Sequence, residues 1–500
     1  MTIRTHSIFE MLVALGGSAI VCTAAWAQPA PGERMRVLFP YFQSNGETGV
    51  FLAVSDDGLT FVDANGGRPI FTPPQWDAYE PVQNLTRDPS IVYHDGVFHM
   101  VWTSNWEGPV FGYAHSTDLL DWSEPKPVRP FPGAANPRNI WAPEIDYDPV
   151  RDEFIVLYST TLPGEFEDND GSDDQHGGDH RVFIVRTKDF ESFTEPEVLF
   201  DPWISTIDAD LHYDDRDTDS RDDDRWIMVY KREVGVRRGG KNIRIAYRDP
   251  EWKTPWMFVE EPIVGPHTAI RPREVAEGPT LIHDPEVTGG RWLLYWDSYG
   301  NGHYSVAGSD DLMSWEDLTD RMHPPRAHPR HGSPFIAPIN AVAVAMPDWP
   351  PASVRTLSID PEGPGAAEGW WTNTWAGEAV FAADPGAGRT GGPALRVTSP
   401  SIADAGWLRT AYVKPNTRYR LSGWIRTKDL DPGTGMGAVI SVRGRERIVT
   451  PPITGTTAWT RVEVEFTTGR ETSIEFVCLF GGWGSSSGTA WFDDLRLEER

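Results

Sequence analysis

The stretch SDDGLTF, at residues 55–61, contains a turn that recurs along the first two thirds of the chain. In it, an aspartate is followed four residues later by an aromatic residue. STDLLDW, TKDFESF and SDDLMSW repeat this pattern, and YRDPEWKTPW is a looser copy. The recurring aspartates lie 60 to 71 residues apart and are Asp57, Asp118, Asp189, Asp249 and Asp311. Such regular self-similarity predicts one supersecondary unit that is used five times.

Apolar runs of strand length surround these turns. An alternating run such as RVFIVRT leads into each turn, and in four of the five units two further apolar runs precede it, as in PSIVYH and VFHMVWTS. Four antiparallel strands that are repeated radially make up the blades of a propeller. The sequence therefore predicts an all-β fold that begins with a five-bladed β-propeller.

The first unit lacks its leading strand, because only RVLFPYF precedes GVFLAVS. The segment RHGSPFIAPI, at residues 330–339, is left over after the fifth unit, and we expect it to supply the missing inner strand and close the ring. The repeated aspartates are expected to cap their turns through local hydrogen bonds, while the aromatic rings fill the space between blades. They are therefore not candidates for catalysis.

The chain changes in character after about residue 345. The Pro-rich stretch AMPDWPPASV is followed by strongly alternating runs such as RYRLSGWIRT and RVEVEFTT, without helical periodicity. This pattern predicts a β-sandwich of jelly-roll type. We expect a propeller over residues 28–345 and a sandwich over residues 346–500.

The first 27 residues have the pattern of an export signal: a weakly basic start, an apolar stretch, and AWA before Gln28. The apolar run is short for a bilayer span, so we expect a secreted or periplasmic protein without membrane insertion. Of the two cysteines, Cys22 lies inside the signal. Only Cys478 would then remain, and the exported chain would form no internal disulfide.

The charge balance limits the partners that this chain can have. Its 73 acidic residues against 45 basic ones give a formal net charge of −28, whereas nucleic acid requires a basic face. An acidic protein suits a neutral partner such as an oligosaccharide or polysaccharide. We expect no nucleic acid partner, and a monomer.

The openings of the predicted inner strands carry the candidates for chemistry. Inner strands converge on the axis of a propeller, so residues that open them can meet although they are distant in sequence. Four openings carry a carboxylate and the fifth carries an imidazole, and we expect them to share one structural position. These residues are Asp88, Glu144, Asp208 with Asp210, Glu277 and His331.

Carboxylates that face one another in a cleft are what glycoside hydrolysis requires. One must be protonated to donate to the leaving oxygen, and another must be ionised to activate water or attack carbon. A third carboxylate near the acid raises its pKa by like-charge repulsion. The alternatives are a calcium or sodium site on the axis, and capping of the strand starts without chemistry.

The motifs RDPSIV, WAPE, IDADL and EGP, in this order and at these intervals, resemble glycoside hydrolase family 43 from about residue 36 to residue 340. The resemblance implies a five-bladed propeller and hydrolysis with inversion at the anomeric carbon. It implies that Asp88 is the general base and Glu277 the general acid. Asp208 would be the residue that tunes the pKa of the acid. Glu144 stands where many members have Asp or His, and would be a residue of the pocket or one behind it.

Four further residues are weaker candidates for substrate binding. Trp106 and Trp141 can stack on a sugar face, although blade packing explains them equally well. Lys231 can reach a hydroxyl of the substrate or can be a surface lysine. His331 resembles the family's axial histidine, which often lies near a central metal ion. A calcium or sodium ion on the axis is therefore one expectation, and a hydrogen bond that closes the ring is the alternative; no cofactor is required.

The C-terminal region resembles jelly-roll carbohydrate-binding modules, most clearly in its ending TAWFDDLRLEE. Some of its tryptophans are expected to be sugar platforms and most to be core residues. A purely structural domain braced on the propeller is the alternative. The tryptophans considered are Trp370, Trp371, Trp375, Trp407, Trp424, Trp459 and Trp483.

The resemblance favours an exo-acting hydrolase of plant or algal polysaccharide side chains, first of all an α-L-arabinofuranosidase. β-Xylosidase, galactofuranosidase and galactan-directed activities stay open, because rim loops set the choice of sugar. A sialidase is disfavoured, since only the first repeat has the glycine of the sialidase aspartate box and five blades are counted rather than six. A non-catalytic sugar-binding propeller is the alternative of another class.

Overall fold

The computed structural model describes residues 34–74, 76, 84–133, 137–162, 179–216, 218, 223–342, 350–356, 369–445 and 448–500. The predicted export signal and the predicted domain boundary at residues 345 and 346 lie outside these ranges. No helix in the described part of the chain is long and apolar enough to cross a membrane.

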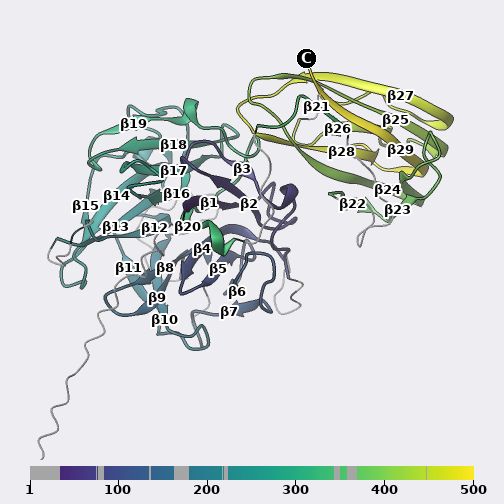
Figure 1. Ribbon diagram of the computed structural model, residues 1–500. Coiled ribbons are helices and arrows are strands. Elements are labelled where there is room, and N and C mark those ends of the chain that lie inside the picture. The colour runs from purple at the N-terminus through teal and green to yellow at the C-terminus, as the bar shows by residue number, and fades with distance from the viewer. Residues whose placement is uncertain are drawn as a thin grey trace, which may run out of the picture.

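Strands β1 to β20 form five four-stranded antiparallel blades, as predicted (Figure 1). The inner strands β20, β4, β8, β12 and β16 pack around the axis. Blade by blade, the strands are β20 (Phe335–Pro338), β1 (Met35–Tyr41), β2 (Phe51–Ser55) and β3 (Val62–Asp63); β4 (Arg87–His94), β5 (Val97–Thr103), β6 (Phe111–Ser116) and β7 (Lys126–Val128); β8 (Trp141–Asp148), β9 (Glu153–Thr160), β10 (Arg181–Thr187) and β11 (Glu197–Phe200); β12 (Thr206–Asp214), β13 (Arg225–Arg232), β14 (Asn242–Arg248) and β15 (Met257–Phe258); and β16 (Glu277–Ile282), β17 (Trp292–Ser298), β18 (His303–Ser309) and β19 (Trp315–Asp317). The short 3-10 turns are η1 (Asn65–Gly67), η3 (Val236–Arg238), η4 (Thr319–Arg321) and η5 (Ile339–Ala341).

The ring closes between the two ends of the propeller sequence. Strand β20 pairs antiparallel with β1, with Arg36 opposite Ala337, and Phe42 forms a bridge with Arg330. The first blade therefore takes its inner strand from the segment at residues 330–339, as the sequence predicts.

The repeated aspartates cap their turns. Asp118 Oδ1 accepts hydrogen bonds of 2.8 Å from the backbone N–H groups of Leu120 and Asp121. Asp57, Asp189, Asp249 and Asp311 accept backbone N–H bonds in the same manner. Their predicted structural role is thus confirmed.

Apolar side chains between neighbouring blades hold the ring together. Phe39 and Phe61 of the first blade pack in one buried cluster with Leu293 and Tyr295 of the fifth, and Phe61 is the aromatic residue of the first repeated turn. Because blades join through such clusters, the inner strands are fixed relative to one another, and so are the residues that open them.

The remaining strands form the C-terminal β-sandwich, around a core that includes Leu421, Phe476, Cys478 and Phe492. Cys478 is buried and is a free thiol. The strands are β21 (Val354–Thr356), β22 (Trp371–Gly377), β23 (Val380–Asp384), β24 (Ala394–Tyr412), β25 (Arg418–Asp431), β26 (Gly437–Val442), β27 (Gly455–Thr467), β28 (Ser473–Gly481) and β29 (Ser486–Glu499).

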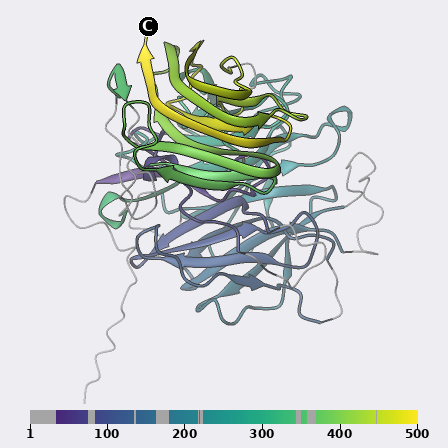
Figure 2. The ribbon, with the colours of Figure 1, turned by 90° about the vertical axis from the view of Figure 1, so that its right-hand side faces the viewer.

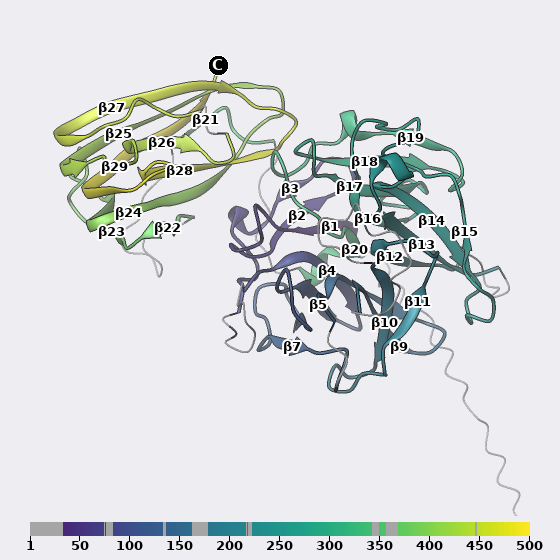
Figure 3. The ribbon, with the colours of Figure 1, turned by 180° about the vertical axis from the view of Figure 1, so that it is seen from behind.

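The sandwich lies against the side of the propeller near β2 and β3 (Figures 2 and 3). Arg326 is the central residue of this contact. Its Nε lies 2.5 Å from Asp63 Oδ2, its Nη1 lies 3.3 Å from Glu475 Oε1, and its Nη2 donates to Thr410 Oγ1 at 2.9 Å. Ser473 Oγ donates to Asp63 Oδ2 at 2.6 Å. Buried charges paired across the contact hold the two domains in one defined arrangement.

Candidate active site

Four inner strands begin with the same irregularity, a β-bulge. The pairing with the next strand shifts between Arg87 and Ser90, Trp141 and Glu144, Ile207 and Asp210, and Glu277 and Thr280. The second residue of each bulge has a positive φ: Asp88 at 49°, Ala142 at 45°, Asp208 at 52° and Gly278 at 56°. Bulges re-aim side chains next to active sites, and non-glycine residues in this conformation are uncommon enough to suggest function.

This register corrects the prediction that the carboxylates share one structural position. Asp88 and Asp208 occupy the positive-φ position, Glu277 stands one residue before it, and Glu144 and Asp210 stand two residues after it. Alternation of apolar residues does not reveal a bulge, so the sequence could not place them more finely. The carboxylates consequently separate into two groups.

The first group surrounds the ring of His331. Its Nδ1 lies 3.1 Å from Asp88 Oδ1. The backbone N–H of Gly278 donates to Asp208 Oδ2 at 3.1 Å. Gly278 follows Glu277 directly and contacts the imidazole so closely that a Cβ there would lie 2.2 Å from His331 Cδ2. The structure therefore brings the three predicted catalytic carboxylates of Asp88, Asp208 and Glu277 together at His331.

The environment of Asp88 favours its ionised form. Burial alone would raise its pKa, but the charge and hydrogen bond of His331 and the charge of Arg87 outweigh burial and lower the pKa to about 2. Burial would likewise lower the pKa of His331, and the surrounding carboxylates of Asp88 and Asp208 instead raise it to about 10. The two side chains thus form a buried ion pair at neutral pH, and Asp88 carries a negative charge.

The environment of Glu277 favours its protonated form. Burial raises its pKa, Lys231 opposes that shift, and the negative charges of Asp297 and Asp208 add to it. Lys231 Nζ lies 3.2 Å from Glu277 Oε2, and Arg330 Nη2 lies 3.1 Å from Oε1. The Glu277 side chain is 17% exposed, which leaves it accessible to a ligand.

Lys231 proves to be a buried residue and not a surface lysine. Its side chain is 2% exposed, and Nζ lies 2.7 Å from Glu233 Oε2, 3.2 Å from Glu277 Oε2 and 5.1 Å from the centre of the Tyr299 ring. Its charge therefore acts on the candidate acid.

Sequence reasoning missed Asp297 and Arg330. Asp297, at the end of β17, accepts from His328 Nε2 at 3.1 Å, from Arg330 Nε at 2.7 Å and from the backbone N–H of His331 at 3.2 Å. It stands opposite Glu277 in the pairing of β16 with β17, just as Lys231 stands opposite Ile207. A search for polar residues that end the second strand of each blade would have found both Asp297 and Lys231.

The second group of carboxylates lies along the propeller axis. Glu144, Asp146 and Asp210 line a cavity of about 320 Å³ between the inner strands. Glu144 Oε1 accepts from Ser333 Oγ at 2.6 Å, and burial raises the pKa of Glu144 to about 7. The charges of His331 and Asp88 act on the pKa of Glu144, which couples this group of carboxylates to the first.

Trp106 and Trp141 are half-buried and touch each other edge to face, with ring centres 5.9 Å apart. The Arg87 guanidinium lies 4.2 Å from the Trp106 ring centre, and His180 stacks on Trp141 at 5.1 Å. Both rings are therefore used at least partly in packing beside Asp88, and their contact with a sugar stays a prediction.

The structure leaves the predicted contact of His331 with a metal ion a prediction. Its Nδ1 is engaged by Asp88, and its Nε2 is buried without a hydrogen-bond partner among the described residues. No cluster of three or more His, Cys, Asp or Glu side chains within the described ranges is arranged to hold one. The axial ion stays a prediction, and no step below depends on it.

Comparison with known proteins places this geometry in a family. Residues 34–342, more than half of the chain, match the family model Glyco_hydro_43_rel, described as "Probable glycosyl hydrolase domain". No curated protein matches the chain.

Several solved structures are similar in fold. An exo-β-1,3-galactanase from Phanerochaete chrysosporium is 12% identical over 85% of this chain and 98% of its own, with a TM-score of 0.38. A xylan β-1,4-xylosidase from Bacillus halodurans is 10% identical over 92% and 96%, with a TM-score of 0.48. An α-L-arabinofuranosidase from Lactobacillus brevis is 20% identical over 46% and 72%, with a TM-score of 0.33. None of these likenesses indicates a substrate for this chain.

Proposed function

Because the chain belongs to a family of glycosyl hydrolase domains related to glycoside hydrolase family 43, we propose that it is an exported, inverting, exo-acting glycosidase. One observation carries the assignment of roles. Within a single cluster, Asp88 is held ionised while the pKa of Glu277 is raised. Two titratable groups whose environments move their pKa values in opposite directions are suited to act as a general base and a general acid.

The proposed reaction is a single displacement. Asp88 removes a proton from a water molecule, whose oxygen forms a bond to the anomeric carbon while the bond to the leaving oxygen breaks. Glu277 gives its proton to that leaving oxygen. Asp208 keeps the pKa of Glu277 raised, and its contact with the Gly278 N–H fixes the backbone beside the acid. The two carboxyl groups of an inverting pair lie about 6.5–9.5 Å apart, so that the water fits between them.

The proposed substrate is a terminal sugar on a side chain of a plant or algal polysaccharide. The Asp88 and Glu277 side chains are only 9% and 17% exposed, which favours a buried terminal sugar over an open groove. An α-L-arabinofuranoside is the first candidate, on the basis of the family resemblance. β-Xylosides, galactofuranosides and galactans are the others.

A panel of aryl glycosides tests this proposal. Arabinofuranoside, xyloside, galactopyranoside and galactofuranoside are offered to the wild type, Asp88→Asn and Glu277→Gln. We expect cleavage of at least one substrate by the wild type, a large loss in Asp88→Asn, and the inverted sugar as the first product seen by NMR. If the wild type cleaves none of these substrates and none of the polysaccharides that contain them, a non-catalytic sugar-binding propeller replaces the glycosidase proposal.

A further inference from the structure

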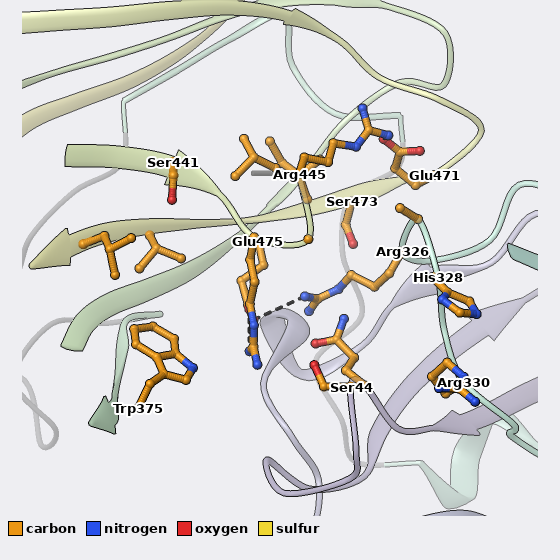
Figure 4. A pocket seen from close by; sticks show the side chains of 18 of the residues that line it. Ser44, Arg326, His328, Arg330, Trp375, Ser441, Arg445, Glu471, Ser473 and Glu475 are labelled. Atoms are coloured by element: carbon orange, nitrogen blue, oxygen red, sulfur yellow. Dashed lines mark hydrogen bonds and ion pairs between the residues drawn. The ribbon is translucent and has the colours of Figure 1, made fainter. Parts of the chain in front are cut away.

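A second cavity, of about 600 Å³, lies between the propeller and the sandwich. Ser44, His328 and Arg330 line it from the propeller, and Trp375, Asp404 and Trp483 line it from the sandwich. Figure 4 shows Trp375 on one side of this space and Ser44 and Arg330 on the other. Its volume is within the ~300–1,000 Å³ of ligand pockets, which occur preferentially at domain interfaces.

Two exposed tryptophans distinguish this cavity from a simple gap. Of the seven sandwich tryptophans considered from the sequence, Trp370 and Trp407 are core residues, and only Trp375 and Trp483 are exposed, at 39% and 48%. Both line the same cavity. Exposed aromatic rings that gather in one concave place mark a binding surface rather than random surface variation.

The loop that carries Trp483 is built to present it. Trp483 has a φ of 56°, a conformation that is rare for a bulky residue, within the glycine-rich run GGWGSSSG. Beside it, the Gly482 N–H donates to Asp404 Oδ1 at 3.2 Å, and the Ser485 N–H donates to Thr434 Oγ1 at 3.1 Å. Because these bonds fix the loop, the Trp483 indole is already ordered before a ligand binds.

The lining carries no strong excess of charge. Its arginines are paired with acids across or beside the cavity: Arg326 and Arg443 with Glu475, and Arg445 with Glu471. The two other carboxylates of the lining, Glu47 and Asp404, each accept a backbone N–H bond. Indole faces and hydrogen-bonding groups remain for a ligand. That combination suits a neutral sugar better than an anion or a basic peptide.

Arg330 connects the cavity to the candidate acid. It lines the cavity, and its Nη2 lies 3.1 Å from Glu277 Oε1. One side chain therefore separates the cavity from Glu277. The acid protonates the leaving oxygen, so the sugar units of the leaving group lie on the side of Glu277.

We propose that this interdomain cavity binds the leaving-group side of the substrate, with Trp375 and Trp483 stacking on neutral sugar units of the polysaccharide main chain. The inference rests on the proposed function. In this proposal the sandwich contributes to the active site itself and does not act only as a separate domain that holds the protein on the polysaccharide.

The test compares a polysaccharide with an aryl glycoside of the same terminal sugar, which has no sugar units on the leaving side. In Trp375→Ala, Trp483→Ala and the double variant, we expect kcat/KM on the polysaccharide to fall relative to kcat/KM on the aryl glycoside. In the double variant this ratio should fall by at least tenfold. Phe258→Ala removes an aromatic ring on β15 that is more exposed, at 60%, and it should keep the wild-type ratio. An unchanged ratio in the double variant would overturn the inference.

A binding measurement separates this inference from the catalytic proposal. In the Glu277→Gln background, retention in a gel that contains the polysaccharide needs no turnover. We expect retention that the two tryptophan changes abolish and Phe258→Ala does not. Retention that survives the double change, or no retention on any polysaccharide tested, would overturn the inference even if aryl glycosides are cleaved. Trp-dependent retention without any cleavage would instead remove the catalytic proposal alone.

Discussion

Glu277 and Gly278 show how closely chemistry and backbone are joined at this site. Glu277 faces Lys231 and Arg330, while Gly278, one residue on, bonds Asp208 and makes room for His331. The sequence EGP could be recognised as a motif, but the contacts of Lys231 and Arg330 with Glu277 could not. They come from β13 and from the segment before β20, and only the closed ring brings them there.

Gly278→Ala is expected to reduce kcat/KM at least tenfold, because the new Cβ would clash with the His331 ring that holds Asp88. Gly289→Ala is the matched control: its φ is 64°, close to the 56° of Gly278, but a Cβ there meets nothing within 4 Å. Both changes should cost roughly 1–2 kcal/mol of stability from the left-handed backbone. Equal activity in the two variants would contradict the role given to the His331 contact.

The pH dependence of activity should respond in opposite directions to two substitutions. Activity needs Asp88 ionised and Glu277 protonated. Since the pKa of Asp88 is about 2, Asp88 should stay ionised over the pH range in which the protein is folded. The loss of the proton from Glu277 should therefore set the basic limb of the pH profile. Lys231→Met removes a charge that lowers the pKa of Glu277 and should move this limb to higher pH, by about 1 unit or more.

Asp208→Asn removes a charge that raises the pKa of Glu277, and the basic limb of its residual activity should move to lower pH. Full profiles of kcat/KM against pH, with thermal unfolding to confirm folding at each end, provide the measurement. Shifts in the same direction for both variants would show that Glu277 does not govern this limb.

The strands were predictable as elements, and their bulges were not. The repeated turn, the alternating runs and the leftover segment at residues 330–339 were sufficient for five blades and their closure. The bulges that open β4, β8, β12 and β16 depend on pairing between strands, which a single sequence does not show. For that reason the sequence pointed to Asp88, Asp208 and Glu277, which the structure brings together, while their positions were wrongly taken as equivalent.

The capped turns yield a prediction at the scale of one element. Asp118→Ala removes two backbone hydrogen bonds at the start of a turn and should cost about 1 kcal/mol of stability without changing kcat. Asp121→Ala, in the same turn, should cost less, because Asp121 is exposed and contributes its backbone N–H, not its carboxylate, to the cap. Thermal unfolding and a standard assay are sufficient, and a loss of kcat in Asp118→Ala would reopen a catalytic role for the repeat.

The two domains behave as one molecule because their contact contains buried charge. Arg326 is 4% exposed, and its acidic partners Asp63 and Glu475 are 0% and 3% exposed. The sequence predicted two domains and left open whether the second binds sugar or braces the first. No pattern in it marked Arg326, whose acidic partners lie more than a hundred residues away.

Arg326→Met should destabilise the protein by roughly 3–5 kcal/mol, because it leaves the buried Asp63 carboxylate without its cation and leaves Glu475 with Arg443 alone. Arg291→Met is the matched control, since Arg291 pairs with the exposed Asp310 and should cost less than about 1 kcal/mol. Denaturant unfolding gives both values. Equal, small losses would show that the interdomain network contributes little.

The central claim, that Glu277 donates the proton to the leaving oxygen, is tested most directly by the leaving-group dependence of Glu277→Gln. We expect kcat/KM of this variant to fall roughly 10²–10⁴-fold on a natural disaccharide linkage, whose leaving oxygen needs a proton. On a nitrophenyl glycoside, whose leaving group departs without a proton, kcat/KM of the variant should fall far less. Equal losses on both substrates, or no loss on the disaccharide, would contradict it.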